Sequence, residues 1–414
     1  MTLWKKIVLV VIFLGIAVGF GYFVFRLFFA PTPNANISNY NVNGVLPNVN
    51  LINRPEANIN GQANVNGVLP NINGVYQPPS EVAAGGYTSA KEIISQSTQD
   101  LVMAGNKKDI IYYDKYTGEF KKKAADGSSE TLLTQQKYPQ VDKIYWSPAR
   151  DKAVLSFPDG SKIVYDFNQD KQYSLPRETT EFSFSPSGSQ IAYKYVGAQP
   201  DENWLAVSNP DGSGAQVVEA LGDKTNLVKV DWSPNNQMVA YYTDTSTSTE
   251  QDIIFLGLNN ENFPAVKVDG LNFNGRWSPG GDKILYSISS SNTSYNPTLW
   301  VMDGTLANLG GSPQELDIQT WPDKCAFGSL DTIYCAVPTY LPSGSDLYPE
   351  ITNGVADEFY KIDLNTGVKT LLALPVDSSG YGTFTADKIF LSSGEDLLYF
   401  TDQTTGRLYQ IRLK

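Results

Sequence analysis

The sequence has 414 residues, of which 41% are hydrophobic and 12% aromatic, so it can bury a large core. It carries 31 basic and 43 acidic residues, a formal charge of -12, which argues against a nucleic-acid partner held through a basic face. Histidine is absent, and this excludes Ser-His-Asp and Cys-His nucleophile systems as well as histidine-ligated zinc or haem. Carboxylate chemistry remains open.

An uncharged apolar run, IVLVVIFLGIAVGFGYFVF, occupies residues 7–25 and ends before a basic residue. At about 1.5 Å per residue, a helix of this length crosses a bilayer core of about 30 Å. A cleaved signal peptide is the alternative, but Phe28 stands where a small residue is wanted and Pro31 follows Ala30 directly. We therefore expect residues 1–30 to hold a short tail and a single transmembrane anchor.

Two basic residues, Lys5 and Lys6, precede the apolar run. Under the positive-inside rule they keep the N-terminus in the cytoplasm and place the rest of the chain outside. The sequence thus predicts a single-pass protein of the cell membrane with an extracytoplasmic main domain.

Residues 31–90 are dominated by Asn, Pro and Gly, and NVNGVLPNVN at 41–50 returns as NVNGVLPNIN at 64–73. The alternation of Asn with Val or Ile has the period of a strand, so a small β-structure is one interpretation. However, Pro47 and Pro70 interrupt the two units, and there is little apolar bulk for a core. We expect a disordered linker with a reach of about 40–45 Å as a random coil.

From residue 91 onward one motif returns seven times: an aromatic residue or Met, a Ser-Pro or related turn, and a short apolar strand that in most copies contains Tyr. The anchors of the copies are Met103, Trp146, Phe184, Trp232, Trp277, Phe327 and Phe390. Further β-prone segments follow each hairpin, which gives about four strands per copy. This is the period of a β-propeller blade.

Each copy predicts a β-hairpin. In Ser185-Pro186-Ser187-Gly188 the residue types fit a type I turn, in which Ser accepts a local hydrogen bond and Pro presets φ. The strands beyond the turn are apolar on both faces, so a blade can bury these faces only against the neighbouring blades. We therefore expect the anchor aromatics to pack between blades rather than to bind a ligand.

The last copy ends one strand short, while KEIISQ at residues 91–96 precedes the first copy without a hairpin partner. We expect this segment to complete the final blade as its outermost strand and so remove an open sheet edge. The fold class is therefore all-β, a seven-bladed propeller over residues 91–414. A six-bladed ring, with the first copy discounted, is the alternative.

The motif is clearest in RWSPGGDKILYS at residues 276–287. It resembles the WSPDG-type repeats of TolB-like propellers and of the propeller domains in prolyl-oligopeptidase-type peptidases. The resemblance covers about residues 91–414 and implies the fold rather than an activity. TolB proteins are soluble in the periplasm and carry an N-terminal α/β domain, where this chain has a predicted anchor and linker. We do not expect the hydrolase activity of those peptidases, since the repeats bring no hydrolase domain with them and histidine is absent.

Two cysteines, Cys325 and Cys335, flank a shortened copy of the hairpin. If Phe327 faces Ile333, the cysteines face each other across the strands. They form either a disulfide, which an extracytoplasmic location favours, or a pair of buried thiols.

The remaining site predictions concern loops. FPDGS at residues 157–161 and NPDGSG at 209–214 offer one Asp before Gly and are turns rather than calcium loops, which need several oxygen ligands. The long insertion between strands at residues 338–358 presents Tyr340, Leu341 and Tyr348 and is a candidate binding loop. An elaborated loop without a ligand is the alternative. No catalytic, cofactor-binding or metal-binding residue is predicted.

The sequence therefore predicts a non-enzymatic binding or scaffolding module of a prokaryotic cell envelope, anchored in the membrane, with an envelope protein or a cell-wall polymer as partner. The alternative is a carboxylate-based glycan hydrolase or lyase with Asp or Glu in the propeller channel, where paired carboxylates would act. A purely architectural surface head is a third interpretation.

Overall fold

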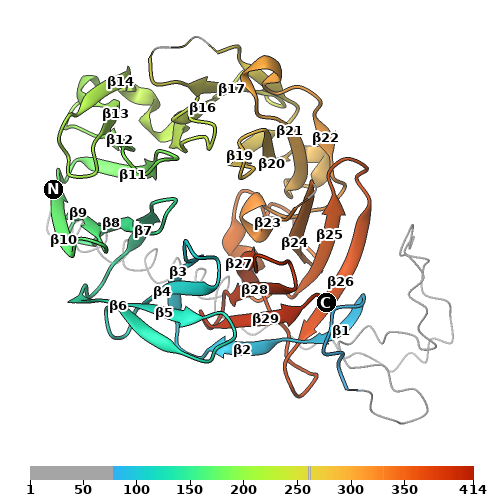
Figure 1. Cartoon of the computed structure of the whole chain (residues 1–414). Helices are drawn as coiled ribbons and strands as arrows, with labels where there is room; N and C mark the ends of the chain where they lie inside the picture. Colours follow the sequence, from blue (N-terminus) through green and yellow to red (C-terminus); the bar gives the residue numbers. More distant parts are fainter. Residues whose placement is uncertain (1–77, 260, 262, 330) are drawn as a thin grey trace, which may run out of the picture. The chain divides into compact units, whose positions relative to one another are not determined.

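A computed structural model describes residues 78–414 except positions 260, 262 and 330. Its strands form seven sheets arranged in a ring (Figure 1). The chain is thus all-β with a seven-bladed propeller, and the six-bladed alternative is wrong. The predicted anchor, at residues 7–25, lies outside the described residues; within them, no helix combines the length and apolarity required to span a bilayer.

Blades are numbered here in chain order. Blade 1 comprises β3 (Thr98–Met103), β4 (Asp109–Asp114), β5 (Glu119–Ala124) and β6 (Glu130–Lys137). Blade 2 comprises β7 (Lys143–Trp146), β8 (Lys152–Ser156), β9 (Lys162–Asp166) and β10 (Lys171–Leu175). Blade 3 comprises β11 (Thr179–Phe184), β12 (Ile191–Tyr195), β13 (Trp204–Ser208) and β14 (Gln216–Ala220). Blade 4 comprises β15 (Val228–Val230), β16 (Ala240–Thr245), β17 (Gln251–Leu256) and β18 (Val266–Val268).

Blade 5 comprises β19 (Leu271–Trp277), β20 (Lys283–Ser289), β21 (Thr298–Asp303) and β22 (Gln314–Glu315). Blade 6 comprises β23 (Cys325–Phe327), β24 (Thr332–Pro338), β25 (Asp357–Asp363), β26 (Lys369–Val376) and β1 (Gly86–Ser89). Blade 7 comprises β27 (Ala386–Leu391), β28 (Leu397–Asp402), β29 (Leu408–Arg412) and β2 (Lys91–Ile94). Short 3-10 helices lie in the loops: η1 (Pro200–Glu202), η2 (Gly222–Leu227), η3 (Ser291–Thr293), η4 (Leu306–Asn308), η5 (Pro322–Lys324) and η6 (Pro349–Thr352).

The two faces of the ring carry different loops. Counted outward from the innermost strand, successive strands among the first four of each blade are antiparallel. Turns after the first and third strands therefore lie on one face, which we call the hairpin face. Loops after the second strand, together with the connections between blades, lie on the other face, which we call the connection face.

A serine hydroxyl closes the repeated Ser-Pro turn, as the sequence predicts. In five blades this Oγ accepts a hydrogen bond from the backbone N–H five residues later, at 2.9 to 3.1 Å. The serines are Ser147, Ser185, Ser233, Ser278 and Ser392. The first four are buried, so the hydroxyl satisfies a backbone donor that water cannot reach.

The hydrophobic core consists of seven clusters, each made by two neighbouring blades. Between blades 4 and 5, for example, the rings of Phe255 and Trp277 lie 5.8 Å apart, centroid to centroid. Trp232 is 4% exposed between blades 3 and 4. The anchor aromatics that belong to these clusters therefore fill the space between blades, which confirms their predicted structural role.

β2, from the N-terminal end of the described chain, closes the ring. β2 pairs antiparallel with β29, with Lys91 opposite Gln410 and Glu92 opposite Tyr409, so the predicted closure is confirmed (Figure 1). Ile94, 1% exposed, packs in the cluster between blades 7 and 1. The seam between the two ends of the described chain is thus as well packed as the other interfaces.

A strand that the sequence analysis placed in the linker extends the sheet of blade 6. β1 pairs parallel with β26, with Gly86 opposite Ala373, so ordered structure begins before the predicted boundary at residue 90. The reason is that the strand GYTS has a single large apolar residue and no strand period of its own. Its hydrogen-bonding partner is the edge of β26, which local sequence cannot indicate.

Candidate functional site

Two long loops on the connection face form one surface, which we call the loop platform: residues 290–297 after β20 and residues 339–356 after β24. The longer loop is held on the shorter one by backbone hydrogen bonds, from Gly344 N to Ser294 O at 2.8 Å and from Asp346 N to Tyr295 O at 3.0 Å. The side chain of Asn296 donates to the carbonyl of Leu341 at 3.3 Å. These bonds order the platform although it lies outside the sheets.

Large apolar side chains stand exposed on this platform. Of the three residues predicted from the sequence, Tyr340 is 64% and Tyr348 60% exposed, whereas Leu341 is partly buried. Exposed residues that the sequence analysis missed are Tyr295, Leu347 and Ile351, at 38%, 46% and 43%. Clustered exposed aromatic and aliphatic side chains on an ordered backbone are typical of interaction surfaces.

The backbone of the shorter loop is strained. Ser294 and Tyr295 have φ of 56° and 55°, the left-handed region that non-glycine residues rarely adopt. Each such residue costs about 1–3 kcal/mol and persists only where the surroundings hold it. Here the hydrogen bonds from the longer loop hold both residues, so the orientation of Tyr295 is fixed by the fold.

The carboxylate of Asp346 ties the platform to the connection between blades 5 and 6. Asp346 Oδ1 accepts a hydrogen bond from Trp321 Nε1 at 3.1 Å, and Trp321 lies on the connection between blades 5 and 6. Burial raises the pKa of Asp346 above its ordinary value. The platform is thereby tied to both blades.

The hairpin that leads into the longer loop carries the two cysteines. Cys325 lies opposite Cys335, and Phe327 opposite Ile333, which is the predicted register. The cysteines form a disulfide with a Cα–Cα distance of 4.1 Å, and both are fully buried in the cluster between blades 5 and 6. The bond therefore staples the first hairpin of the blade that carries the platform.

Replacing Cys335 with Ser in the full chain is expected to lower the free energy of unfolding by about 3 kcal/mol, from loss of a short covalent loop. Urea denaturation with and without reductant provides the measurement. Wild-type protein should lose a similar amount on reduction, and the variant should not respond to reductant. Equal stability of oxidised and reduced wild type would contradict a stabilising bridge.

Carboxylates of three blades cap the following blade; Asp100 and Glu181 are on innermost strands, and Asp357 is at the start of β25. Acidic side chains accept hydrogen bonds from backbone N–H groups on the following innermost strand, where no further strand is available. The pairs are Asp100 with Ile144, Glu181 with Val230, and Asp357 with Ala386, at 3.2, 2.9 and 2.6 Å. These carboxylates thus have a structural role: they accept hydrogen bonds from backbone N–H groups that would otherwise be unpaired at the inner edge of the next sheet.

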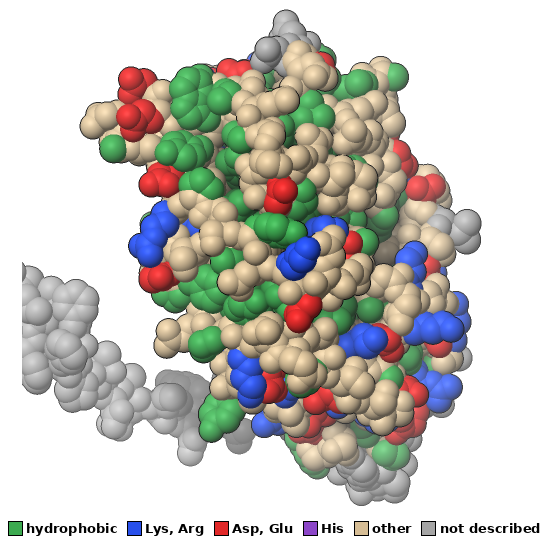
Figure 2. Space-filling view, turned by 60° about the vertical axis from the view of Figure 1, so that its left-hand side comes forward, with side chains coloured by type: hydrophobic (Ala, Val, Ile, Leu, Met, Phe, Trp, Pro, Cys, Tyr) green, Lys and Arg blue, Asp and Glu red, His purple; other side chains and the backbone are tan. Residues whose placement is uncertain are grey.

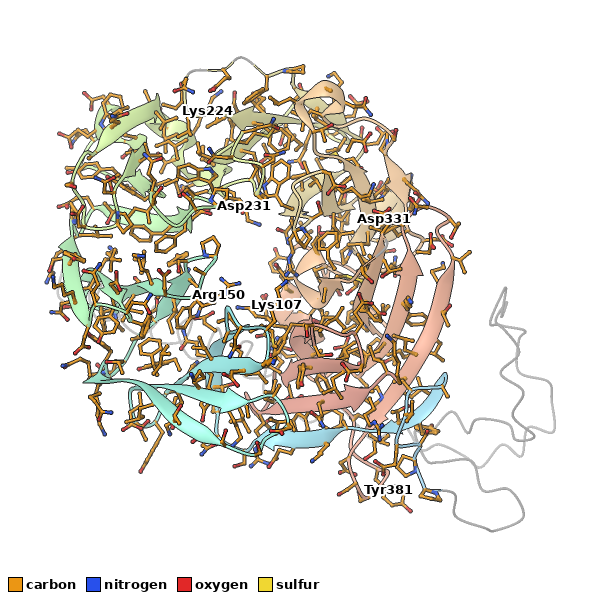
Figure 3. The ribbon with its side chains drawn as sticks, viewed as in Figure 1. Lys107, Arg150, Lys224, Asp231, Asp331 and Tyr381 are labelled. Atoms are coloured by element: carbon orange, nitrogen blue, oxygen red, sulfur yellow. A yellow bond between two sulfur atoms is a disulfide. The ribbon has the colours of Figure 1, made fainter. Side chains whose placement is uncertain are left out.

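One channel carboxylate differs from these. Asp231 follows β15 and lies at the edge of the central opening, as do Lys107 and Arg150 (Figure 3). Within the described residues its carboxylate makes no hydrogen bond or ion pair. Burial raises its pKa to about 6, because desolvation outweighs the attraction of Lys229 and Arg276. Sequence spacing gave no signal for this residue.

The variant Asp231→Asn is expected to stabilise the protein at about pH 8 and to have little effect at about pH 4. The folded-state pKa lies above the ordinary value of 3.8, so the group favours folding at low pH and loses this contribution as pH rises through about 6. A shift of this size corresponds to at most about 3 kcal/mol. Thermal unfolding at both pH values is the measurement, with Asp201→Asn, an exposed residue, as control. Equal effects at both pH values would refute the assignment.

The two Asp-Gly segments are turns, as predicted. Asp159 Oδ1 accepts from the backbone N–H of Ser161, and Asp211 Oδ1 from that of Ser213, both at 2.9 Å. Each carboxylate caps its own turn. Over the described residues, no cluster of three or more potential metal-ligating His, Cys, Asp or Glu side chains occurs.

Charges of both signs are mixed on the surface. On the side drawn in Figure 2, Lys and Arg side chains lie between Asp and Glu side chains, with hydrophobic side chains among them. This side therefore lacks a large patch of one charge sign, which is the feature that attracts a highly charged polymer.

Comparison with known proteins supports the fold. No protein-family model matches the chain, and no curated protein sequence matches it. Among solved structures, the β-propeller domain of Cps50 (Swd1) from Myceliophteria thermophila is similar with a TM-score of 0.52 and 10% identity, covering 78% of this chain and 100% of that domain. An oligogalacturonate lyase in complex with manganese has a TM-score of 0.51 and 11% identity, covering 79% and 90%.

A prolyl endopeptidase is similar over 78% of this chain and 49% of its own length, with a TM-score of 0.50 and 13% identity. At these identities the likeness shows the β-propeller fold alone. The fold is shared by enzymes and by proteins whose names indicate no enzymatic activity, so function has to be argued from the site.

Proposed function

We propose that this protein is a membrane-anchored, extracytoplasmic β-propeller that binds another protein of a prokaryotic envelope through the loop platform. The observation that carries the proposal is a set of exposed apolar side chains on a hydrogen-bonded and strained backbone. Tyr is enriched at protein interfaces because its large ring loses little conformational entropy. A wall polymer would offer hydroxyls, so the aliphatic Leu347 and Ile351 favour a protein partner.

Features outside the platform support the setting. The apolar run at residues 7–25 supports a single-pass anchor, and the disulfide between Cys325 and Cys335 suits an oxidising compartment. The serine-closed hairpins support a relationship to TolB-like propellers. Binding rather than catalysis is the role proposed, because the large exposed side chains of the platform are apolar.

Photocrosslinking in the cells that produce the full chain tests the proposal. A photoreactive residue in place of Tyr340 or Tyr348 should give a discrete protein adduct that mass spectrometry identifies. The same residue in place of Val368, which is 62% exposed on the hairpin face, is the matched control and should not give this adduct. Adducts that are the same at all three positions, or absent from Tyr340 and Tyr348, would refute the platform as a protein-binding site.

A second candidate function, a carboxylate-based glycan hydrolase or lyase, is favoured by Asp231. A carboxyl group with a pKa near 6 beside two basic residues is suited to proton transfer near neutral pH. This candidate predicts turnover of a wall polysaccharide by the purified full chain and its loss in Asp231→Asn. Retained turnover in that variant would exclude Asp231 as the acid or base.

A further inference from the structure

A polar cleft opens on the connection face between blades 7 and 1. Its volume is about 310 Å³, and it is lined by Ser97 and the first residues of β3, by Lys115 in the β4–β5 turn, by the start of β27, and by the end of β28 with the β28–β29 turn. This volume is at the lower end of the range for ligand sites. The cleft lies at the seam that β2 closes, so its two walls come from opposite ends of the propeller sequence.

The walls are fixed by hydrogen bonds across the seam. Thr98 donates from its backbone N and from its Oγ1 to the carbonyl of Gly406, at 2.9 and 2.7 Å. Asp402 Oδ2 caps the β28–β29 turn by accepting from the N–H and the hydroxyl of Thr405, at 3.0 and 2.7 Å. Gly406 has φ of +67°, and a Cβ there would lie 2.5 Å from Ser97 Oγ. Glycine therefore lets the two walls approach.

The charges inside the cleft largely cancel. Lys388 pairs with Asp100 at 3.1 Å, and Asp402 is engaged by its own turn. This leaves Lys115 and Asp387 as lining residues of opposite charge. With three Asp and two Lys side chains, the lining has a formal charge of only -1, which is a weak basis for selecting a phosphate, a sulfate or a metal cation.

Five lining side chains make no hydrogen bond or ion pair with other residues that the structure describes. They are Ser97, Lys115, Asp387, Gln403 and Thr404. Together they offer hydroxyl, amide, ammonium and carboxylate groups, both donors and acceptors, from four different chain segments. Leu101 is the single large apolar residue among the lining residues, so an apolar ligand would find little surface to bury.

An exposed aromatic residue is next in sequence to a residue of the cleft lining. Tyr116 follows Lys115 in the β4–β5 turn and is 97% exposed. An exposed flat ring can pack against the C–H face of a sugar, while the donors and acceptors of the lining bind its hydroxyls. From the polarity, the small net charge and the exposed ring one residue away from the lining, we propose that this cleft binds a neutral carbohydrate, independently of the loop platform.

Isothermal titration of the full-length chain in detergent tests the proposal. The probes are the neutral oligosaccharides cellohexaose, mannohexaose and chitohexaose, with oligogalacturonate as the anionic comparison. At least one neutral probe should bind, and Asp387→Ala, Gln403→Ala and Tyr116→Ala should each weaken it about tenfold or more, which is about 1.4 kcal/mol. The three side chains have no internal partner, so thermal unfolding should show an unchanged fold.

The matched control is Tyr340→Ala, on the loop platform, which should leave carbohydrate affinity unchanged. Absence of binding by all three neutral probes would overturn the proposal. Equal or tighter binding of oligogalacturonate, or binding that all three cleft variants leave unchanged, would also overturn it.

Discussion

A chain that begins at Ser97, and so lacks β1 and β2, is expected to lose cooperative unfolding and to aggregate. Without β2, the outer edge of β29 has free backbone donors and acceptors, and the cluster between blades 7 and 1 loses Ile93 and Ile94. Removing two buried isoleucines costs about 4–10 kcal/mol, which is comparable with the whole stability of a domain. Size-exclusion chromatography and thermal unfolding monitored by circular dichroism are the measurements.

The matched control begins at Pro78 and keeps both strands, so it should stay free of aggregates and unfold in one transition. Ile94→Asp in the full chain provides a milder test, since it places a charge in the same cluster. A truncated chain that unfolds with the same midpoint as the control would show that β2 is dispensable for closure.

The variant Asp357→Ala is expected to destabilise the protein by about 3–5 kcal/mol, because it leaves a buried ammonium group without its partner. Asp357 and Lys324 are 3% and 9% exposed, and the carboxylate lies 2.8 Å from Nζ. The same carboxylate accepts the backbone N–H of Ala386 at 2.6 Å, which joins blade 6 to blade 7. Urea denaturation of both proteins at neutral pH measures the difference.

The surface pair Lys369–Asp317, with Asp317 87% exposed at its side chain, is the control. Asp317→Ala should cost less than about 1 kcal/mol. The double variant Lys324→Met with Asp357→Leu should be more stable than Asp357→Ala, because it removes both charges. Equal free energies of unfolding for Asp357→Ala and Asp317→Ala would show that the buried pair contributes no more to stability than the surface pair.

The periodic part of the fold was predictable because each blade repeats the same local chemistry. Ser, Pro and Gly mark the hairpins, and the serine hydroxyl that closes the turn is encoded within six residues, as in Ser278 to Lys283. The register of Cys325 with Cys335 also follows from a short hairpin. The repeated blade architecture can therefore be predicted from local turn residues and strand period, without knowledge of contacts between distant residues.

The site was only partly predictable. The length of the insertion after Pro338 drew attention to Tyr340 and Tyr348, but Tyr295 belongs to a different blade and joins them only through loop-to-loop hydrogen bonds. The raised pKa of Asp231 depends on burial in the assembled ring. The cleft lies between the two ends of the propeller sequence. None of these properties has a local pattern in the chain.

The seam has a consequence for biosynthesis. Arg407 and Glu92, 315 positions apart, form an ion pair across it. β2 leaves the ribosome before the blades do, but it can pair only after β29 (Leu408–Arg412) has been translated. A nascent chain that stalls within the seventh blade cannot close the ring, so strand edges stay unpaired and apolar side chains stay exposed. Proteases and chaperones can recognise these features, which the finished protein lacks.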